Sequence, residues 1–332
     1  MELLSKNRKC IMGFAIILVV IFHSHFLLTI KAFNFLKEFF YCGVDIFIFF
    51  SGFGCYCSLK KAQSIKKFIS RRINRIYPTY IVFISFWLIF VALKRGISLL
   101  SVLGNIFLFG YYFGLQNQFN WYVQALPLFY FIVILIYILL QKVNNKICLF
   151  VLSFLSLVLL SFCFFNSDLL IIFSRLPILL IGIICGYIYI NNKNVRLKTW
   201  SIKKINKIIP FILIFISLIF TLILIIVFKN YSELLWDYGI YWYSFIFITP
   251  GLLLLLCKIF NKFDKHFLYR LLELIGESTF EIYLLHIFIF SDLFTNVDGA
   301  LINIILIIVS IVSGIGFNRL ILLANKYIKR RT

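Results

Sequence analysis

Acidic residues and long polar stretches are scarce in this chain of 332 residues. Only 12 residues are Asp or Glu, against 33 Lys or Arg, and charged residues of either sign make up 14% of the chain. Hydrophobic residues make up 63%, and the mean hydropathy is +1.03. No soluble fold needs so much apolar surface, and the apolar residues form repeated runs of about 20, the length of a membrane-spanning helix. The sequence therefore predicts an all-α, polytopic membrane protein.

Three further absences narrow the prediction. The first apolar run, at 10–30, is not followed by a small-residue cleavage site, so we expect a retained helix rather than a signal peptide. Most of the eight cysteines lie in or beside apolar runs, and Cys55 and Cys57 have no metal-ligand partners nearby, so we expect neither disulfides nor a metal site. No repeat, low-complexity tract or appended soluble domain is visible. We expect one membrane domain over residues 1–332.

The basic residues are concentrated in short loops between apolar runs. The loop 60–75 carries seven basic residues and the loop 191–207 carries six, and neither contains an acid. This distribution is the positive-inside pattern, which places both loops in the cytoplasm. It also argues against nucleic acid as the reason for the net charge of +21. The two ends of the chain are basic as well, so we expect both termini to be cytoplasmic.

The number of crossings follows from parity. The eleven apolar runs are 10–30, 39–58, 76–93, 99–113, 122–140, 147–165, 169–190, 208–228, 239–257, 278–295 and 299–323. Five runs separate the two basic loops, yet an even number must cross for both loops to face the cytoplasm. The run 99–113 is the shortest and is interrupted by Gly104, Asn105 and Gly110. We predict that it is a re-entrant or interfacial segment beside ten spanning helices.

Two ionisable residues lie inside the first two predicted spans. His23 lies in "FAIILVVIFHSHF" and Asp45 in "GVDIFIFFSGF". A rise of about 1.5 Å per residue places each roughly 10 Å below the outer surface. Consecutive antiparallel helices usually neighbour each other, so a His23–Asp45 pair is expected, with the carboxylate supporting a general base. The alternative is a structural polar contact. His25 lies about 200° further round the helix and is the expected bystander.

A basic cluster follows in "RRINRIYPTY". Arg71, Arg72 and Arg75 share one face of a helix that enters the third span from the cytoplasm, and Tyr80 follows them. The planar guanidinium group suits phosphate oxygens. A basic collar before a span is also what topology and anionic lipids require. The spacing alone leaves both interpretations open.

Later polar residues complete the set of candidates. Asn120 and Trp121 in "NWYVQALPLFY" and Arg175 in "SRLPILLIG" lie near outer boundaries, where an aromatic belt or a snorkelling arginine is the structural alternative. Glu281 and His286 lie within one span, in "STFEIYLLHIFIF". Two ionisable groups in one span are costly, which favours a functional role or a structural pairing.

These motifs, in this order, resemble the integral-membrane acyltransferase 3 family, and the similarity covers essentially the whole chain. The resemblance implies a ten-helix membrane enzyme that uses cytosolic acyl-coenzyme A. It implies that His23 is catalytic, that Asp45 matches the family aspartate, and that Arg71, Arg72, Arg75 and Tyr80 belong to its donor-binding motif. Two positions depart from the family pattern. Met12 occupies a position that is often basic, and Lys9 lies one turn earlier on a similar face. Leu126 and Pro127 occupy a place that is often acidic.

The function expected from this resemblance is transfer of an acyl group, expected to be acetyl, from acyl-coenzyme A to a hydroxyl of an exported polysaccharide or lipid-linked glycan. His23, Asp45, Glu281 and His286 are the catalytic candidates. Asn120, Trp121 and Arg175 are the acceptor-binding candidates. We expect a multi-pass protein of the cell membrane, with membrane lipids and a glycan as partners and no nucleic acid. His23 either deprotonates the acceptor or carries the acyl group transiently.

Two alternatives come from other classes. A transporter or flippase of acyl or glycan intermediates also buries ionisable groups, but such proteins tend to contain internal repeats, and we find none. A glycan polymerase would display a large outer loop rich in acidic residues or arginine. The longest expected outer loop here, from Lys229 to Gly239, has only about 11 residues.

Overall fold

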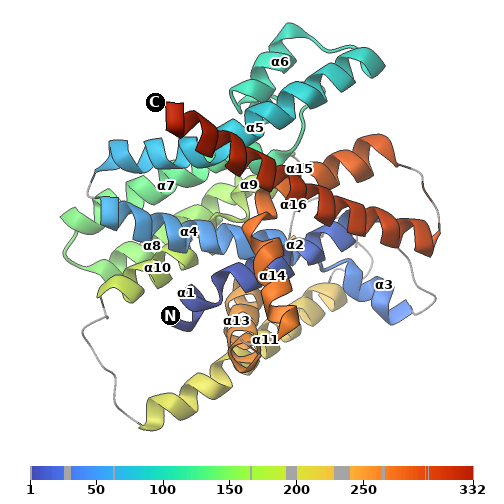
Figure 1. Ribbon diagram of the computed structural model, residues 1–332. Coiled ribbons are helices and arrows are strands. Elements are labelled where there is room, and N and C mark those ends of the chain that lie inside the picture. Colours follow the sequence, from blue (N-terminus) through green and yellow to red (C-terminus); the bar gives the residue numbers. More distant parts are fainter. Residues whose placement is uncertain are drawn as a thin grey trace. The chain divides into compact units, whose positions relative to one another are not determined.

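The computed structural model describes residues 2–25, 31–62, 64–164, 167–191, 200–227, 240–263, 266–295, 297 and 299–331 (Figure 1). Within these ranges the secondary structure is helical, which confirms the all-α prediction. In chain order the elements are α1 (Glu2–Lys6), α2 (Arg8–His23), α3 (Lys31–Lys37), α4 (Cys42–Ala62), α5 (Ile65–Arg95), α6 (Leu99–Ile106), the 3₁₀ turn η1 (Gly110–Phe113), α7 (Trp121–Lys142), α8 (Lys146–Phe162), α9 (Leu170–Phe173), α10 (Leu176–Asn191), α11 (Trp200–Val227), α13 (Ile240–Lys262), α14 (Phe267–Glu277), α15 (Thr279–Phe288), the π-helical turn η3 (Ile289–Leu293) and α16 (Ala300–Arg331).

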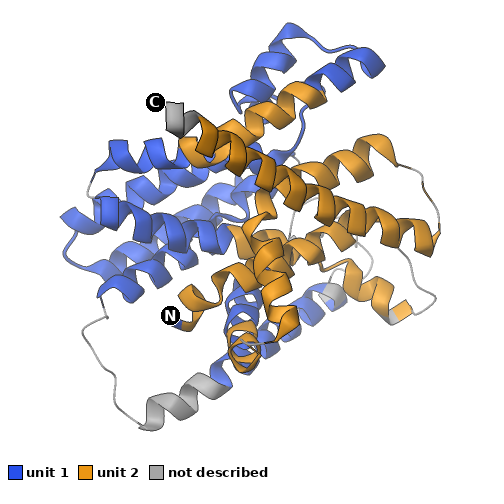
Figure 2. Cartoon of the chain, viewed as in Figure 1, with its two compact units in different colours: residues 1–2, 48–72, 88–255 blue, residues 3–47, 73–87, 256–332 orange. Residues whose placement is uncertain are grey.

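The helices gather into two compact units (Figure 2). Unit 1 contains residues 1–2, 48–72 and 88–255, and unit 2 contains residues 3–47, 73–87 and 256–332. The division passes through α4 and α5, so neither unit is a continuous segment of the chain. Unit 2 brings the N-terminal helix α2 together with the C-terminal helices α14, α15 and α16.

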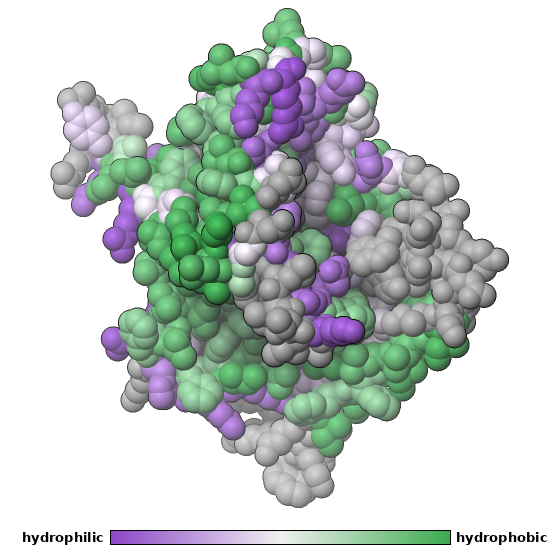
Figure 3. All heavy atoms as spheres, turned by 90° about the vertical axis from the view of Figure 1, so that its right-hand side faces the viewer, coloured by the Kyte–Doolittle hydropathy of each residue, from purple (hydrophilic) through white to green (hydrophobic). Residues whose placement is uncertain are grey.

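Many described helices have the length and composition of membrane spans. Six qualify alone, and a seventh qualifies if α14 and α15, which meet at a bend of 72°, form one span with η3. The six are Phe33–Ala62, Ile65–Arg95, Trp121–Lys142, Leu170–Asn191, Trp242–Lys262 and Ala300–Tyr327. Large apolar side chains point outward along them, such as Leu301 and Leu320 on α16. Figure 3 likewise shows hydrophobic residues over much of the visible surface. The chain is thus a multi-pass membrane protein.

The other three predicted spans correspond to shorter apolar helices. These are α2 with 16 residues, α8 with 17 residues, and the stretch Ile208–Leu224 of α11. Each is shorter than the roughly 20 residues that cross a bilayer without tilt or thinning. The total of ten crossings and the cytoplasmic termini therefore stay predictions. Residues 192–199 of the basic loop 191–207 lie outside the described residues, and the outer loop 229–239 lies outside them entirely.

The segment 99–113 is too short to cross, as predicted. It forms α6, of eight residues, and the four-residue turn η1. Asn105 on α6 donates to the Asn117 carbonyl (2.9 Å) and accepts from the Phe119 amide (2.9 Å). Gln124 of α7 accepts from the Tyr111 amide at 2.7 Å. These bonds satisfy irregular backbone inside the protein, the condition under which such a segment is tolerated at membrane depth.

In unit 2, α2 and α14 approach each other at two glycines. A Cβ atom at Gly13 would lie 2.0 Å from the Leu272 carbonyl oxygen, and one at Gly276 would lie 1.8 Å from the Lys9 carbonyl oxygen. Neither glycine therefore tolerates a side chain without separation of the helices. Close approach through small residues is a common way for membrane helices to associate.

We predict that Gly276→Val lowers the stability of the folded protein by about 1–3 kcal/mol or more, because the added methyl groups force the two backbones apart. The matched control is Gly316→Ala on α16, where an added Cβ meets nothing within 4 Å. Thermal unfolding of the purified protein in detergent measures both. Equal stability of the two variants would contradict the proposed close packing.

Candidate functional site

His23 is the last residue of α2, and its ring is held by the helix itself. Its Nδ1 atom lies 2.9 Å from the Val19 carbonyl oxygen, one turn earlier. The next residue, Ser24, ends the helix and donates from its hydroxyl to the Ile21 carbonyl (2.7 Å). The His23 side chain is half-buried. The helix α2 ends at His23, seven residues before the end of the predicted span 10–30, and residues 26–30 of that span lie outside the described ranges.

His286 of α15 lies against His23 within unit 2. The centroids of the two imidazole rings are 5.0 Å apart, and the ring planes meet at 69°. His286 is fully buried, and its Nδ1 atom lies 3.0 Å from the Ile282 carbonyl oxygen. The Tyr283 ring packs against it with a centroid distance of 5.2 Å. The structure therefore brings together two of the four catalytic candidates.

The backbone contacts determine the tautomer of each histidine. A carbonyl oxygen only accepts hydrogen bonds, so Nδ1 must carry the hydrogen in both rings. In a neutral ring Nε2 then has the free lone pair. Nε2 of His286 is buried and has no hydrogen-bond partner among the described residues. The site therefore presents one partly accessible basic nitrogen, on His23, beside a second basic ring that is sealed from solvent.

Asp45 does not pair with His23, which corrects the expected contact. The recorded neighbours of His23 in the described part of unit 2 are Val19, Phe22, His286 and the charge of Lys37. The helices α2 and α4 are neighbours, as predicted, but Gly43 of α4 packs on Ala15 and Val19 of α2. The first turn of α4 therefore lies beside the middle of α2, one to two turns before His23. Asp45 is buried there, near the Cys42 thiol.

Lys37 is a residue of this site that sequence reasoning missed. It ends α3 and is buried, with only 8% of its surface exposed. Its ammonium group donates to the Ser24 carbonyl oxygen at 2.5 Å, directly after His23, and its charge acts on the His23 ring. A cation at a helix C-terminus satisfies carbonyl groups that the helix leaves open. In the sequence, Lys37 precedes Glu38 and looks like an ordinary charged residue of a loop. No spacing to another polar residue singles it out as part of a site.

Glu281 lies on α15, as His286 does, but on a different face of the helix. Its carboxylate contacts residues of α5. Its buried carboxylate accepts a hydrogen bond from the Thr79 side chain and lies within electrostatic range of Arg75. Five residues separate Glu281 from His286, which is about 140° round the helix, so the two do not share a face. The structure thus joins a catalytic candidate, Glu281, to a donor-binding candidate, Arg75.

The arginine cluster lies on one continuous helix, as predicted, and this helix begins at Ile65. Pro78 therefore lies in the middle of α5. Arg71 and Arg75 are exposed. The Arg72 guanidinium carbon lies 5.3 Å from the centroid of the Phe68 ring, an arrangement that holds the group while leaving donors for an anion. Tyr80 is buried at 1% exposure, so its side chain belongs to the core.

The acceptor-binding candidates come together in unit 1. The Arg175 guanidinium carbon lies 5.2 Å from the Trp121 ring centroid and 4.4 Å from that of Trp242, a residue that the sequence did not single out. Arg175 also donates to the Ile171 carbonyl at 2.9 Å. Asn120 caps α7, because its side-chain oxygen accepts from the Tyr122 amide at 2.8 Å. That cap is a structural role for Asn120.

No group of three or more His, Cys, Asp or Glu side chains within the described ranges has the arrangement of a metal site. The polar groups described above are instead a histidine pair, a buried carboxylate with a threonine and an arginine, and an arginine between two tryptophans. A multi-pass helical protein that retains such groups is of the class that carries out chemistry or transport within the membrane.

The chain belongs to the acyltransferase 3 family. The model of this family, described as an acyltransferase domain, matches residues 10–321, nearly the whole chain. The match confirms the resemblance inferred from the ordered motifs, and it makes the protein an acyltransferase that transfers groups other than aminoacyl groups. No curated protein and no solved structure shows significant similarity to the chain.

We predict that Thr79→Val lowers the free energy of unfolding by about 1–3 kcal/mol, because the isosteric side chain no longer donates to the buried Glu281 carboxylate. The control is Ser313→Ala, whose hydroxyl is exposed and bonds only within its own helix. Thermal unfolding in detergent compares the two. A Thr79→Val protein as stable as Ser313→Ala would argue against the contact.

Proposed function

We propose that this acyltransferase moves an acyl group, expected to be acetyl, from cytosolic acyl-coenzyme A to a hydroxyl of an exported polysaccharide or lipid-linked glycan in the cell membrane. The observation that carries the proposal is the His23–His286 pair, with ring centroids 5.0 Å apart at the end of α2. Transfer between a thioester and an alcohol needs one group that takes the hydroxyl proton. A neutral imidazole at membrane depth suits this task.

The proposed reaction follows from the tautomer of His23. Its Nε2 lone pair takes the proton of the acceptor hydroxyl while the oxygen attacks the thioester carbonyl carbon. The carbon–oxygen bond forms, the carbon–sulfur bond breaks, and the Nε2 proton passes to the departing coenzyme A thiolate. Meanwhile the Nδ1–H bond to the Val19 carbonyl keeps the ring in place. In the covalent variant of this proposal Nε2 attacks the thioester carbon first, and coenzyme A leaves as the thiolate. The acceptor hydroxyl then attacks the acyl carbon, the bond between this carbon and Nε2 breaks, and the hydroxyl proton passes to the thiolate.

His286 supports this step as a positioning residue. Its buried ring lies against His23, and its own Nδ1–H is bound to the Ile282 carbonyl. When His23 takes up a proton, an adjacent neutral ring stabilises the cation without competing for the hydroxyl proton. Asp45 and Glu281 do not touch His23 in the described structure. We therefore propose that Asp45 stabilises the first turn of α4, and that Glu281 positions Arg75.

We propose that two separate groups of residues bind the acyl donor and the glycan acceptor. Arg71, Arg72 and Arg75 on α5 suit the phosphates of acyl-coenzyme A, since guanidinium groups bind phosphate oxygens in a bidentate manner. The tryptophan pair around Arg175 suits a glycan, because aromatic faces pack on sugar rings and the guanidinium group donates to hydroxyls.

We predict that His23→Ala lowers kcat by about 10²- to 10⁴-fold, the usual contribution of a general base. The assay is transfer of labelled acetyl groups from acetyl-coenzyme A to glycan in proteoliposomes, with folding checked by gel filtration. His25→Ala is the matched control, because the His25 side chain is exposed. Normal turnover by His23→Ala would remove the central assignment. Label that crosses the membrane without joining glycan would favour a transporter or flippase.

We predict that Lys37→Met lowers kcat by about 10- to 100-fold with little change in the donor KM. The ammonium group holds the carbonyl directly after His23, and a displacement of about 1 Å can cost 10²-fold in rate. Lys37→Arg, which keeps the charge, is expected to restore part of the rate. Lys31→Met, on the exposed end of the same helix, is the control. An unchanged kcat for Lys37→Met would argue against this role.

A further inference from the structure

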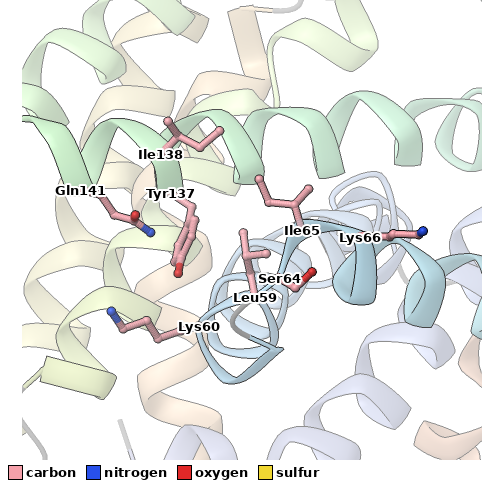
Figure 4. Close-up of a pocket in the computed structure, with 8 residues that line it drawn as sticks. All are labelled: Leu59, Lys60, Ser64, Ile65, Lys66, Tyr137, Ile138 and Gln141. Atoms are coloured by element: carbon pink, nitrogen blue, oxygen red, sulfur yellow. The ribbon is translucent and has the colours of Figure 1, made fainter.

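A polar cavity outside the histidine site opens in unit 1, where three helix ends meet. Its volume is about 570 Å³. It is lined by Leu59 and Lys60 at the end of α4, by Ser64, Ile65 and Lys66 at the start of α5, and by Tyr137, Ile138 and Gln141 at the end of α7 (Figure 4). The basic loop 60–75 forms part of this lining. The positive-inside pattern therefore predicts that the cavity faces the cytoplasm.

The charge around this cavity has one sign. Its lining contains two lysines and no acid. The neighbouring residues Lys61, Lys67 and Lys142 add three further positive charges. Within the described residues neither Lys60 nor Lys66 forms an ion pair. Repulsion among these ammonium groups is relieved when an anion enters, so the electrostatics favour a ligand that carries more than one negative charge.

The side chains divide the cavity into a polar end and an apolar wall. Figure 4 shows Lys60 and Gln141 extending toward the same end, with the Tyr137 hydroxyl between them. Lys66 extends away at the opposite side. Ile65, Ile138 and Leu59 supply apolar surface, and the Tyr137 ring adds an aromatic face. A ligand with a flat ring and a terminal phosphate matches this division, with the phosphate beside Lys60.

We infer that this cavity holds the 3′-phosphoadenosine end of the acyl donor. The inference rests on the proposed use of acyl-coenzyme A. The volume lies within the range of about 300–1,000 Å³ that is usual for small-ligand sites. Coenzyme A combines an adenine ring with a terminal 3′-phosphate, whereas pantetheine thioesters and acylated carrier proteins have no adenosine. The cavity thereby selects the free coenzyme A thioester as the donor.

The position of the cavity also assigns separate roles to Lys60 at the end of α4 and to Arg72 on α5. Lys60 lies with Gln141 at the polar end of the cavity, and we assign the 3′-phosphate to it. Arg72 lies further along α5 than the lining residues Ser64, Ile65 and Lys66, and its guanidinium group is supported by Phe68. We assign the pyrophosphate to Arg72.

The test compares acetyl-coenzyme A with acetyl-dephospho-coenzyme A, which lacks only the 3′-phosphate. For the unmodified protein we expect a KM about 10-fold or more higher for the dephospho donor, the size of one charge-assisted hydrogen bond. Lys60→Met is expected to raise the KM for acetyl-coenzyme A by the same factor and to leave that for the dephospho donor unchanged. Lys60→Arg is expected to retain the discrimination. Lys262→Met, at an exposed position at the end of α13 and outside the lining, is the control.

A purely structural role of Lys60 would raise both KM values alike, and that result would overturn the inference. So would equal use of both donors by the unmodified protein. Proteoliposomes of phosphatidylcholine, with and without phosphatidylglycerol, separate a lipid site from a donor site. If Lys60→Met changed the KM only in the presence of phosphatidylglycerol, and equally for both donors, this result would also overturn the inference.

A binding measurement keeps this test independent of the proposed reaction. Calorimetry in detergent with 3′,5′-ADP is expected to show binding to the unmodified protein and about 10-fold weaker binding to Lys60→Met. Binding without any acetyl transfer would retain the cavity assignment and reject the proposed function. Acetyl transfer without binding of 3′,5′-ADP would retain the proposed function and reject the cavity assignment.

Discussion

The contact between the backbones of α2 and α14 sets the geometry of unit 2. Gly13 and Gly276 let the two helices approach so closely that carbonyl oxygens occupy the space of the missing side chains. The chain then turns by 72° at Ser278, and α15 also packs against α2. This bend carries His286 back to the end of α2. A change in the helix separation would therefore be transmitted directly to the distance between the two imidazole rings.

Apolar surroundings explain how the polar groups of this unit are bound. In hydrocarbon an unsatisfied donor costs several kcal/mol, so each ionisable side chain needs a partner within the protein. Both histidines use the nearest available acceptor, the carbonyl one turn earlier on their own helix. Lys37 uses the open carbonyl at the end of α2, and Glu281 uses Thr79. In each histidine this leaves Nε2 as the basic nitrogen, which is the state that the proposed proton transfer requires.

Sequence patterns predicted the helices of this protein better than the contacts between side chains on different helices. Hydropathy and charge identified the helical class and the short segment 99–113, and they singled out His23 and His286, which the structure brings together. The expected His23–Asp45 pair was wrong, because equal depth does not fix the register of two helices. That register depends on Gly43 packing beside Ala15 and Val19, which no periodicity encodes. Lys37 and Trp242 were missed for a related reason, since their roles arise only from partners distant in sequence.

The helix α5 contributes residues to both units. It runs unbroken from Ile65 to Arg95, although Pro78 removes one of its internal hydrogen bonds. Along it lie Lys66 at the cavity, the arginines, and then Thr79, which binds Glu281. One helix therefore carries residues of the cavity, the arginine cluster and the contact to Glu281, and this helix belongs to both units.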